Sequence, residues 1–170
     1  MSHPNRFGTA FRGRRVSAVA DSALAARRGA RLAAVQAMYQ IGLVGTAAET
    51  VVAEMAARPS PTGALDKAFL RRLTDGALAH AEALDAAISE TLREGWSLAR
   101  LSLTMRGILR VATYEIRDCL DVPSRVAVSE YVAIAHSFFD EDEAGFVNGA
   151  LETLARRLRA AEWADGQQGK

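Results

Sequence analysis

The sequence predicts an all-helical domain, and three observations support this fold class. The 170 residues include 49% hydrophobic but only 6% aromatic residues, with four prolines and many alanines and leucines, a composition that favours helices. Apolar residues recur at spacings of three and four along most of the chain, which is the repeat of an amphipathic helix. The segments between these stripes are short, so we expect about seven helices in one compact bundle.

The two ends of the chain differ from this helical centre. Residues 1–20 are polar, contain Gly, Ser and Arg, and show no apolar repeat, so we expect a disordered basic tail. Residues 21–162 are expected to form a single helical domain, and residues 163–170 a frayed C-terminus.

The first four helices follow from caps, stripes and breaks. The first is expected to begin at Asp21 or Ser22, either of which can cap it. Thr46 and Glu49 form a capping-box pattern for the second helix, which the 59–63 segment, PSPTG, ends. The expected inward-facing residues of these four helices are Leu32, Val35, Tyr39 and Leu43; Val51, Val52 and Met55; Phe69, Leu70, Leu73 and Ala77; and Leu84, Ile88 and Leu92.

Three further helices are expected in the second half of the chain. Ser102 can cap the fifth helix, and Pro123 closes the turn after it. Acidic residues at 140–143 stand where the seventh helix begins, a position that the helix dipole favours for acids. The expected stripes are Ile108, Leu109, Ala112, Ile116 and Leu120; Val128, Val132, Ala135 and Phe139; and Phe146, Val147, Ala150, Leu151, Leu154 and Leu158.

Charge is distributed unevenly along the chain. Residues 1–31 contain seven arginines and one acid, Asp21, so their net charge is +6. Because the net charge of the whole chain is +1, the remaining residues carry −5. A basic N-terminal segment on a mildly acidic body indicates a polyanionic partner for that segment.

Arg27, Arg28 and Arg31 are the part of this segment that lies in the first helix. Cations in the first turns oppose the helix dipole, and the pair four residues apart repel each other. Arg28 shares a side with the apolar stripe, so the stripe ends there and the first turns are expected to project from the body. A solvated helix end is one interpretation; the other is that RNA or DNA phosphates supply the missing anions, because guanidinium groups bind them in a fork.

Catalytic and metal-binding patterns are not found in the sequence. The three histidines are far apart, Cys119 is the single cysteine, and no glycine-rich phosphate loop is present. A calcium loop beginning at Asp140 would need an oxygen ligand at Ala144 and an acid at Leu151, so it fails. We therefore expect a protein that is not an enzyme and that has no cofactor and no metal site.

The sequence also bears on the compartment. No apolar run approaches the ~18–20 residues of a membrane span, and no apolar signal segment follows the N-terminal arginines. The expected location is the cytoplasm, without membrane attachment.

Three segments resemble the NusB transcription antitermination family, in the same order along the chain. "ARRGARLAAVQAMYQ" (26–40) is similar to the arginine-rich start of that family, and "GILRVATYEI" (107–116) to its fifth helix. "DVPSRVAVSEYVAIAHSFFDEDEAGFVNGALETLA" (121–155) is similar to its Asp-Val-Pro segment and Phe-Val-Asn-Gly ending. The resemblance covers residues 25 to about 158.

The resemblance implies an all-α fold of two packed helical subdomains and a protein that binds RNA without catalysis. Members of the family pair with NusE, which is also a ribosomal protein. The pair binds the single-stranded boxA element of nascent ribosomal RNA leaders and joins an antitermination complex on RNA polymerase. Whether this chain forms a homodimer stays open.

The resemblance also implies a set of RNA-binding residues. Arg27, Arg28 and Arg31 match the RNA-contacting arginines of the family, Tyr39 a tyrosine near the RNA, and Asp142 an acid that influences RNA binding. From its place on the apolar stripe, we expect the Tyr39 ring to be buried with its hydroxyl exposed.

Some residues depart from the family pattern. Met105 stands where the family has an acid, and Gly29 weakens the arginine helix, so we expect this segment to be mobile until RNA binds. Glu115 and Glu130 could pair within the chain or contact a partner, and we favour pairing within the chain.

Two alternative functions remain. One is a helical RNA-binding domain related to those that precede the catalytic domain of ribosomal RNA cytosine methyltransferases, without activity here because the sequence has no segment for a cofactor-binding sheet. The other is an adaptor that binds only proteins through its acidic body.

Overall fold

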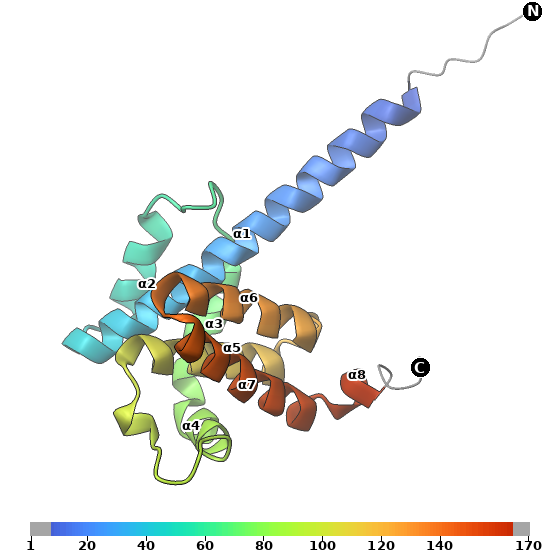
Figure 1. Cartoon of the computed structure of the whole chain (residues 1–170). Helices are drawn as coiled ribbons and strands as arrows, with labels where there is room; N and C mark the ends of the chain where they lie inside the picture. The colour runs from blue at the N-terminus through green and yellow to red at the C-terminus, as the bar shows by residue number, and fades with distance from the viewer. Residues whose placement is uncertain (1–7, 165–170) are drawn as a thin grey trace, which may run out of the picture.

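The computed structural model describes the backbone of residues 8–164 and the side chains of residues 17–164, and this part of the chain contains helices and turns but no strand. Figure 1 shows the helices and the projecting N-terminal part of the first one. The helices are α1 (Gly8–Val44), α2 (Ala48–Ala57), α3 (Lys67–Ala79), α4 (Ala81–Ser89), α5 (Leu103–Asp118), α6 (Ser124–Phe138), α7 (Glu141–Leu158) and α8 (Ala160–Ala164), with a short 3₁₀ turn, η1, at Leu98–Arg100.

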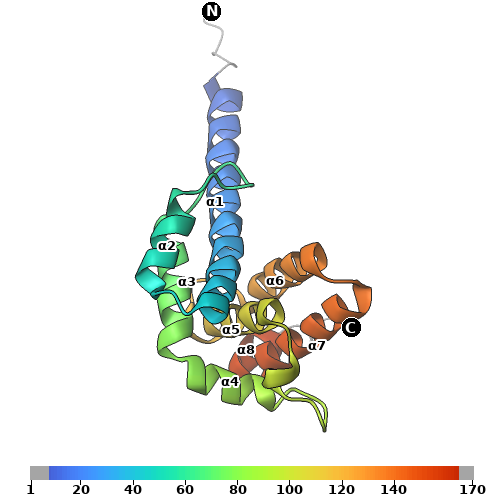
Figure 2. The same cartoon turned by 90° about the vertical axis from the view of Figure 1, so that its left-hand side faces the viewer.

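Helix α5 is the centre of the bundle. It packs against α1, α3 and α4 and also against α6 and α7. Helices α1, α2 and α3 pack against one another, and α6 and α7 form a second group, so Figure 2 shows α1 between the α2–α3 pair and the α6–α7 pair. The prediction of an all-α bundle with two packed groups of helices is confirmed.

The predicted apolar stripes form the core. The largest fully buried side chains include Leu70, Leu73, Leu84, Ile88, Ile108, Leu109, Ile116, Leu151 and Leu154. The prediction is wrong at the ends of three stripes, because Leu43, Leu120 and Leu158 are exposed. Each of these lies in the last turn of its helix or beyond it.

Helix α1 begins earlier than the sequence analysis predicts. Its first residue is Gly8 rather than Asp21 or Ser22, so the predicted tail boundary at residue 20 falls inside a helix, and residues 1–7 lie outside the described part. No proline interrupts residues 8–44, and adding residues to an existing helix is easier than starting one. The side chains of residues 17–24 are exposed, which confirms that the first turns project from the body.

The helix caps give mixed results. The Ser102 side chain accepts a hydrogen bond from the Met105 backbone, and Asp140 caps α7 in the same way. The capping box at Thr46 is wrong, because Ala47 occupies the cap position of α2 without a side-chain hydrogen bond. Helix α2 is held instead by the burial of three apolar side chains, Val51, Val52 and Met55.

The C-terminal helix α8 is anchored to the start of α6, so the predicted fraying from residue 163 is wrong at that residue. The buried Trp163 indole donates a hydrogen bond to the Ser124 hydroxyl over 3.0 Å. The Glu162 carboxylate accepts from both the Ser124 backbone N–H at 2.8 Å and its hydroxyl at 2.6 Å. The guanidinium groups of Arg125 and Arg156 lie over the Trp163 ring at 4.0 and 4.4 Å. Residues 165–170 lie outside the described part.

None of the described helices is long and apolar enough to cross a membrane.

Candidate nucleic-acid interface

Arg31 lies inside the protein rather than on its surface. Its side chain is 4% exposed and forms a two-pronged pair with the buried Glu115 of α5, with Nη2–Oε1 at 2.6 Å and Nε–Oε2 at 3.0 Å. The buried Tyr131 of α6 donates its hydroxyl to Oε2 of the same carboxylate at 2.8 Å. This network joins α1, α5 and α6 at one point of the core.

The network is arranged to keep its charges. Burial alone would lower the pKa of Arg31, but the hydrogen bond and the charge of Glu115 outweigh it and raise that pKa. Burial and then the negative charge of Glu115 raise the pKa of Tyr131 well above its usual value. Tyr131 is therefore a neutral donor, and the charged partners are the guanidinium and the carboxylate.

Among Arg27, Arg28 and Arg31, Arg28 has the side chain most open to solvent. Its side chain is 61% exposed, and its Nε donates to both oxygens of Glu130, at 3.0 and 3.1 Å. Glu130 comes from α6, is 17% exposed, and also lies 3.8 Å from Nη1 of Arg31. The prediction that Glu130 pairs within the chain is confirmed, as it is for Glu115.

Arg27 lies on the other side of α1, against α3 and the turn that follows α5. Its guanidinium is 4.4 Å from the centre of the Phe69 ring and 3.4 Å from Oδ2 of Asp121. Arg72 donates to Oδ1 of the same Asp121 at 3.0 Å. Burial acts to raise the pKa of Asp121, but hydrogen bonds from Arg72 and Arg27 outweigh it and lower that pKa.

The fold therefore brings carboxylates to the arginines of α1, whose neighbours in the sequence include no such acids. We define this cluster as Arg27, Arg28 and Arg31 of α1 together with Arg72, and it faces the carboxylates of four residues, Asp66, Glu115, Asp121 and Glu130. All four acids lie at least 35 positions beyond Arg27, Arg28 and Arg31, so the sequence around these three arginines does not show them. An external anion is therefore not needed to offset these cations.

Gly29 has a packing role. A Cβ there would lie 2.6 Å from the Ser60 hydroxyl and 2.7 Å from the carbonyl oxygen of Ala64, so the α2–α3 loop needs a glycine at this position. The Thr62 hydroxyl of the same loop donates to the Ala25 carbonyl at 2.8 Å. From the sequence alone, Gly29 is only a weak point in the helix. That the segment is mobile without RNA stays a prediction.

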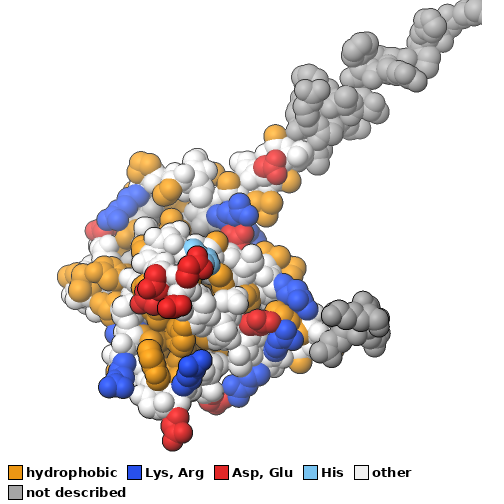
Figure 3. Space-filling view, in the orientation of Figure 1, with side chains coloured by type: hydrophobic (Ala, Val, Ile, Leu, Met, Phe, Trp, Pro, Cys, Tyr) orange, Lys and Arg blue, Asp and Glu red, His pale blue; other side chains and the backbone are white. Residues whose placement is uncertain are grey.

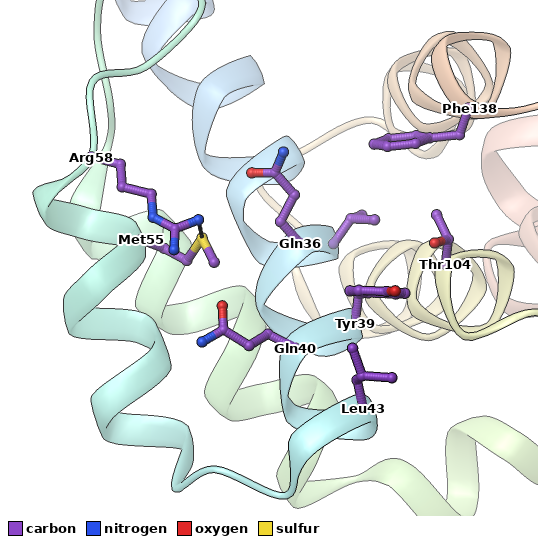
Figure 4. Close-up of a pocket in the computed structure, with 9 residues that line it drawn as sticks. Gln36, Tyr39, Gln40, Leu43, Met55, Arg58, Thr104 and Phe138 are labelled. Atoms are coloured by element: carbon purple, nitrogen blue, oxygen red, sulfur yellow. Dashed lines mark hydrogen bonds between the residues drawn. The ribbon is translucent and has the colours of Figure 1, made fainter.

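Tyr39 is exposed and lies in a groove along α1. Its 41% exposed side chain contradicts the prediction of a buried ring. The groove has a volume of about 510 Å³, and Figure 4 shows α1 as its floor between α2 on one side and α5 and α6 on the other. Its lining residues are Val35, Gln36, Tyr39, Gln40, Leu43, Met55, Arg58, Thr104 and Phe138.

The chemistry of this groove is mixed. Tyr39 and Phe138 offer aromatic surface, whereas Gln36, Gln40 and Arg58 offer amide and guanidinium groups. Aromatic faces next to hydrogen-bonding groups are the combination that holds an unstacked base of a single strand. Tyr39 could be identified from the sequence, but Arg58 and Phe138 could not, because nothing in the sequence shows that the ends of α2 and α6 lie beside α1.

Asp142 does not join the arginines or Tyr39. It lies in the acidic first turn of α7, beside a separate hollow of about 930 Å³ that is also lined by Trp96, Met105 and Phe146. Figure 3 shows acidic side chains gathered on one face of the body, and a basic and an acidic side chain in contact at the foot of the projecting helix. The structure thus divides the predicted site residues among three places.

The comparison with known families decides the affiliation of the chain. The profile of the NusB family matches residues 28–156, which is most of the chain. The chain belongs to the NusB family. The matched range includes Arg28, Arg31, Tyr39 and Asp142 but begins after Arg27 and ends before α8.

Curated NusB proteins are similar over most of their length. The transcription antitermination protein NusB of Rhodopseudomonas palustris is 39% identical over 148 residues, covering 82% of this chain and 85% of the relative. The NusB protein of Rhizobium rhizogenes is 42% identical over 140 residues, covering 78% and 88%.

Solved NusB structures share the fold. T. maritima NusB superimposes with a TM-score of 0.70 at 32% identity, covering 81% of this chain and 96% of that one. A crystal structure of the antitermination factors NusB and NusE in complex with double-stranded RNA gives a TM-score of 0.62 at 27% identity, covering 77% and 96%.

Proposed function

We propose that this chain is an RNA-binding transcription antitermination factor. Together with NusE it would bind the boxA element of nascent ribosomal RNA leaders and help to assemble an antitermination complex on RNA polymerase. Membership of the NusB family, and a structural neighbour that is a NusB protein with NusE and RNA, support this function. The observation that carries it is the exposed Arg28 in the middle of α1 and the aromatic groove around Tyr39 further along the same helix.

The proposed roles follow from exposure. Arg28 and Arg27 contact phosphates, which positions the strand without reading its sequence. Arg31 is too deeply buried for that role and instead fixes α1 against α5 and α6. Tyr39 lies eleven residues after Arg28, about 16 Å along the helix, so one strand can reach both. Asp142 would act from a second contact area at the start of α7.

Arg28→Ala is expected to weaken binding of a boxA RNA about tenfold, because a charge-assisted phosphate contact is lost. Fluorescence anisotropy with boxA and scrambled RNA of equal length, with and without NusE, measures this. With Arg27 and Arg28 as the phosphate contacts, the log–log salt slope of the wild type is expected to be no steeper than about −1.4 on a single strand. Arg71→Ala, which removes an exposed arginine from α3, is the matched control.

The proposed function predicts tighter binding of boxA than of scrambled RNA, and a further gain with NusE. Equal and weak binding of the two RNAs in the presence of NusE would reject it. If Arg28→Ala and Arg71→Ala have the same effect, the arginine cluster is not the phosphate contact.

Tyr39→Ala is expected to weaken boxA binding about tenfold or more, because stacking on an aromatic ring contributes ~1–3 kcal/mol per base. Tyr39→Phe keeps the ring and is expected to stay within twofold of the wild type. The same titrations measure both variants. Equal losses in the two variants would assign the effect to the hydroxyl group and remove stacking from the mechanism.

A further inference from the structure

The two arginines that could contact RNA are already bound to carboxylates of the same chain. Arg28 Nε donates to both oxygens of Glu130, and Arg27 lies 3.4 Å from Asp121. A carboxylate presents two oxygens to a guanidinium in the same fork geometry as a phosphate. Glu130 occupies Nε of Arg28, so a phosphate that binds the edge of this guanidinium formed by Nε and one Nη in a fork must take the place of Glu130.

We propose that Glu130 and Asp121 are internal competitors that an RNA phosphate must displace from Arg28 and Arg27. This inference rests on the proposed function. Because phosphate contacts do not depend on sequence, the competition lowers affinity for every RNA by the same factor. Only an RNA that gains further contacts, such as base contacts in the Tyr39 groove, then binds at low concentration.

Each competing carboxylate has a second arginine that keeps it paired after displacement. Glu130 lies 3.8 Å from Nη1 of Arg31, which is buried and cannot leave with the RNA. Asp121 keeps Arg72 at 3.0 Å when Arg27 moves. An unpaired charge on the half-buried Glu130 would be destabilising. Because Arg31 stays beside Glu130, the loss of Arg28 does not leave it unpaired. The arrangement permits an exchange of partners.

A structural role alone does not explain the Arg28–Glu130 pair. Solvent screens the Arg28 end of this pair, which is 61% exposed, and Glu130 keeps Arg31 as a second partner, so the pair itself contributes little to stability. The pair does, however, occupy the arginine with the largest exposed fraction among Arg27, Arg28 and Arg31. The main consequence of the Arg28–Glu130 pair is therefore that it limits the binding of other anions to Arg28.

Glu130→Gln tests the inference in anisotropy titrations with boxA RNA, scrambled RNA and an oligouridine of equal length. Affinity for all three is expected to rise roughly five- to tenfold by the same factor, since one competing charge is removed. The salt slope is expected to become steeper by about 0.7, the value of one additional neutralised phosphate on a single strand. Asp121→Asn is likewise expected to raise the affinity for all three RNAs and to make the salt slope steeper.

Glu82→Gln is the matched control. It makes the same charge change at an exposed position on α4, where Glu82 forms no ion pair with the residues that the structure describes. Its effect on affinity is expected to stay below about twofold, since exposed charges further away than a Debye length are screened. An equal gain in Glu82→Gln and Glu130→Gln would reduce the effect to net charge and overturn the inference.

Two outcomes separate this inference from the proposed function. If wild type discriminates boxA but Glu130→Gln gains neither affinity nor salt slope, the inference is wrong and the function stands. If wild type does not discriminate boxA and Glu130→Gln still binds all three RNAs more tightly, the function is wrong and the competition stands. A loss of affinity in Glu130→Gln would show that Glu130 orients Arg28 for RNA, and an absence of RNA binding by both proteins would reject both proposals.

Discussion

Glu115→Gln is expected to lower the free energy of unfolding by about 3–5 kcal/mol, the range measured when one partner of a buried ion pair is removed. The substitution keeps the shape of the side chain but leaves the guanidinium of Arg31 buried without its charge partner. Tyr131 also loses the carboxylate to which it donates. Urea denaturation followed by circular dichroism at 222 nm measures the change.

Two further variants separate charge from packing. Arg31→Met combined with Glu115→Leu removes both charges, and it is expected to recover most of the loss because no unpaired buried charge remains. Glu82→Gln, at an exposed position, is expected to change stability by less than about 0.5 kcal/mol. A loss below about 1 kcal/mol for Glu115→Gln would contradict the assignment of the network as the junction of α1, α5 and α6.

Phe69→Ala is expected to lower the free energy of unfolding by about 3–5 kcal/mol, as for other buried aromatic side chains cut back to alanine. Phe69 is almost fully buried in α3, and its ring lies under the guanidinium groups of both Arg27, at 4.4 Å, and Arg31, at 5.3 Å. The ring therefore fills core volume and also gives the two arginines a favourable face. The same urea titration measures the loss.

Phe69→Leu distinguishes these two contributions. Leucine keeps much of the volume but has no aromatic face, so its expected loss is smaller, about 1–2 kcal/mol. Equal losses for leucine and alanine would assign the effect to the ring face. A Phe69→Ala protein as stable as the wild type would show that the arginines do not depend on α3.

The helices and the core could be predicted from the sequence because they depend on local pattern. Stripes such as Phe69, Leu70 and Leu73 repeat at the helical period, and the burial of one face follows from that repeat alone. Ser102 could be assigned as a cap for the same reason, since its partner is three residues away. The stripe ends could not, because the exposure of Leu120 depends on where a neighbouring helix stops.

The candidate site depends on contacts between distant segments, and there the sequence is less informative. The acids that pair with Arg28 and Arg31 lie 102 and 84 positions away, so the arginines look unpaired in the sequence. Gly29 looks like a defect until the loop packed against it is seen. The family resemblance places Arg31 among the RNA contacts, but the fold places its side chain in the core.

The anchoring of α8 to α6 has a consequence for how the chain is made. The first turn of α6 has no side-chain cap from its own sequence, and the Ser124 backbone N–H is bonded by Glu162, 38 positions later. Because synthesis proceeds from the N-terminus, α6 emerges from the ribosome long before the residue that completes its first turn. A nascent chain that ends before Glu162 therefore carries an unfinished second helix group, and the α6–α7 pair reaches its final form only after the last turn has been translated.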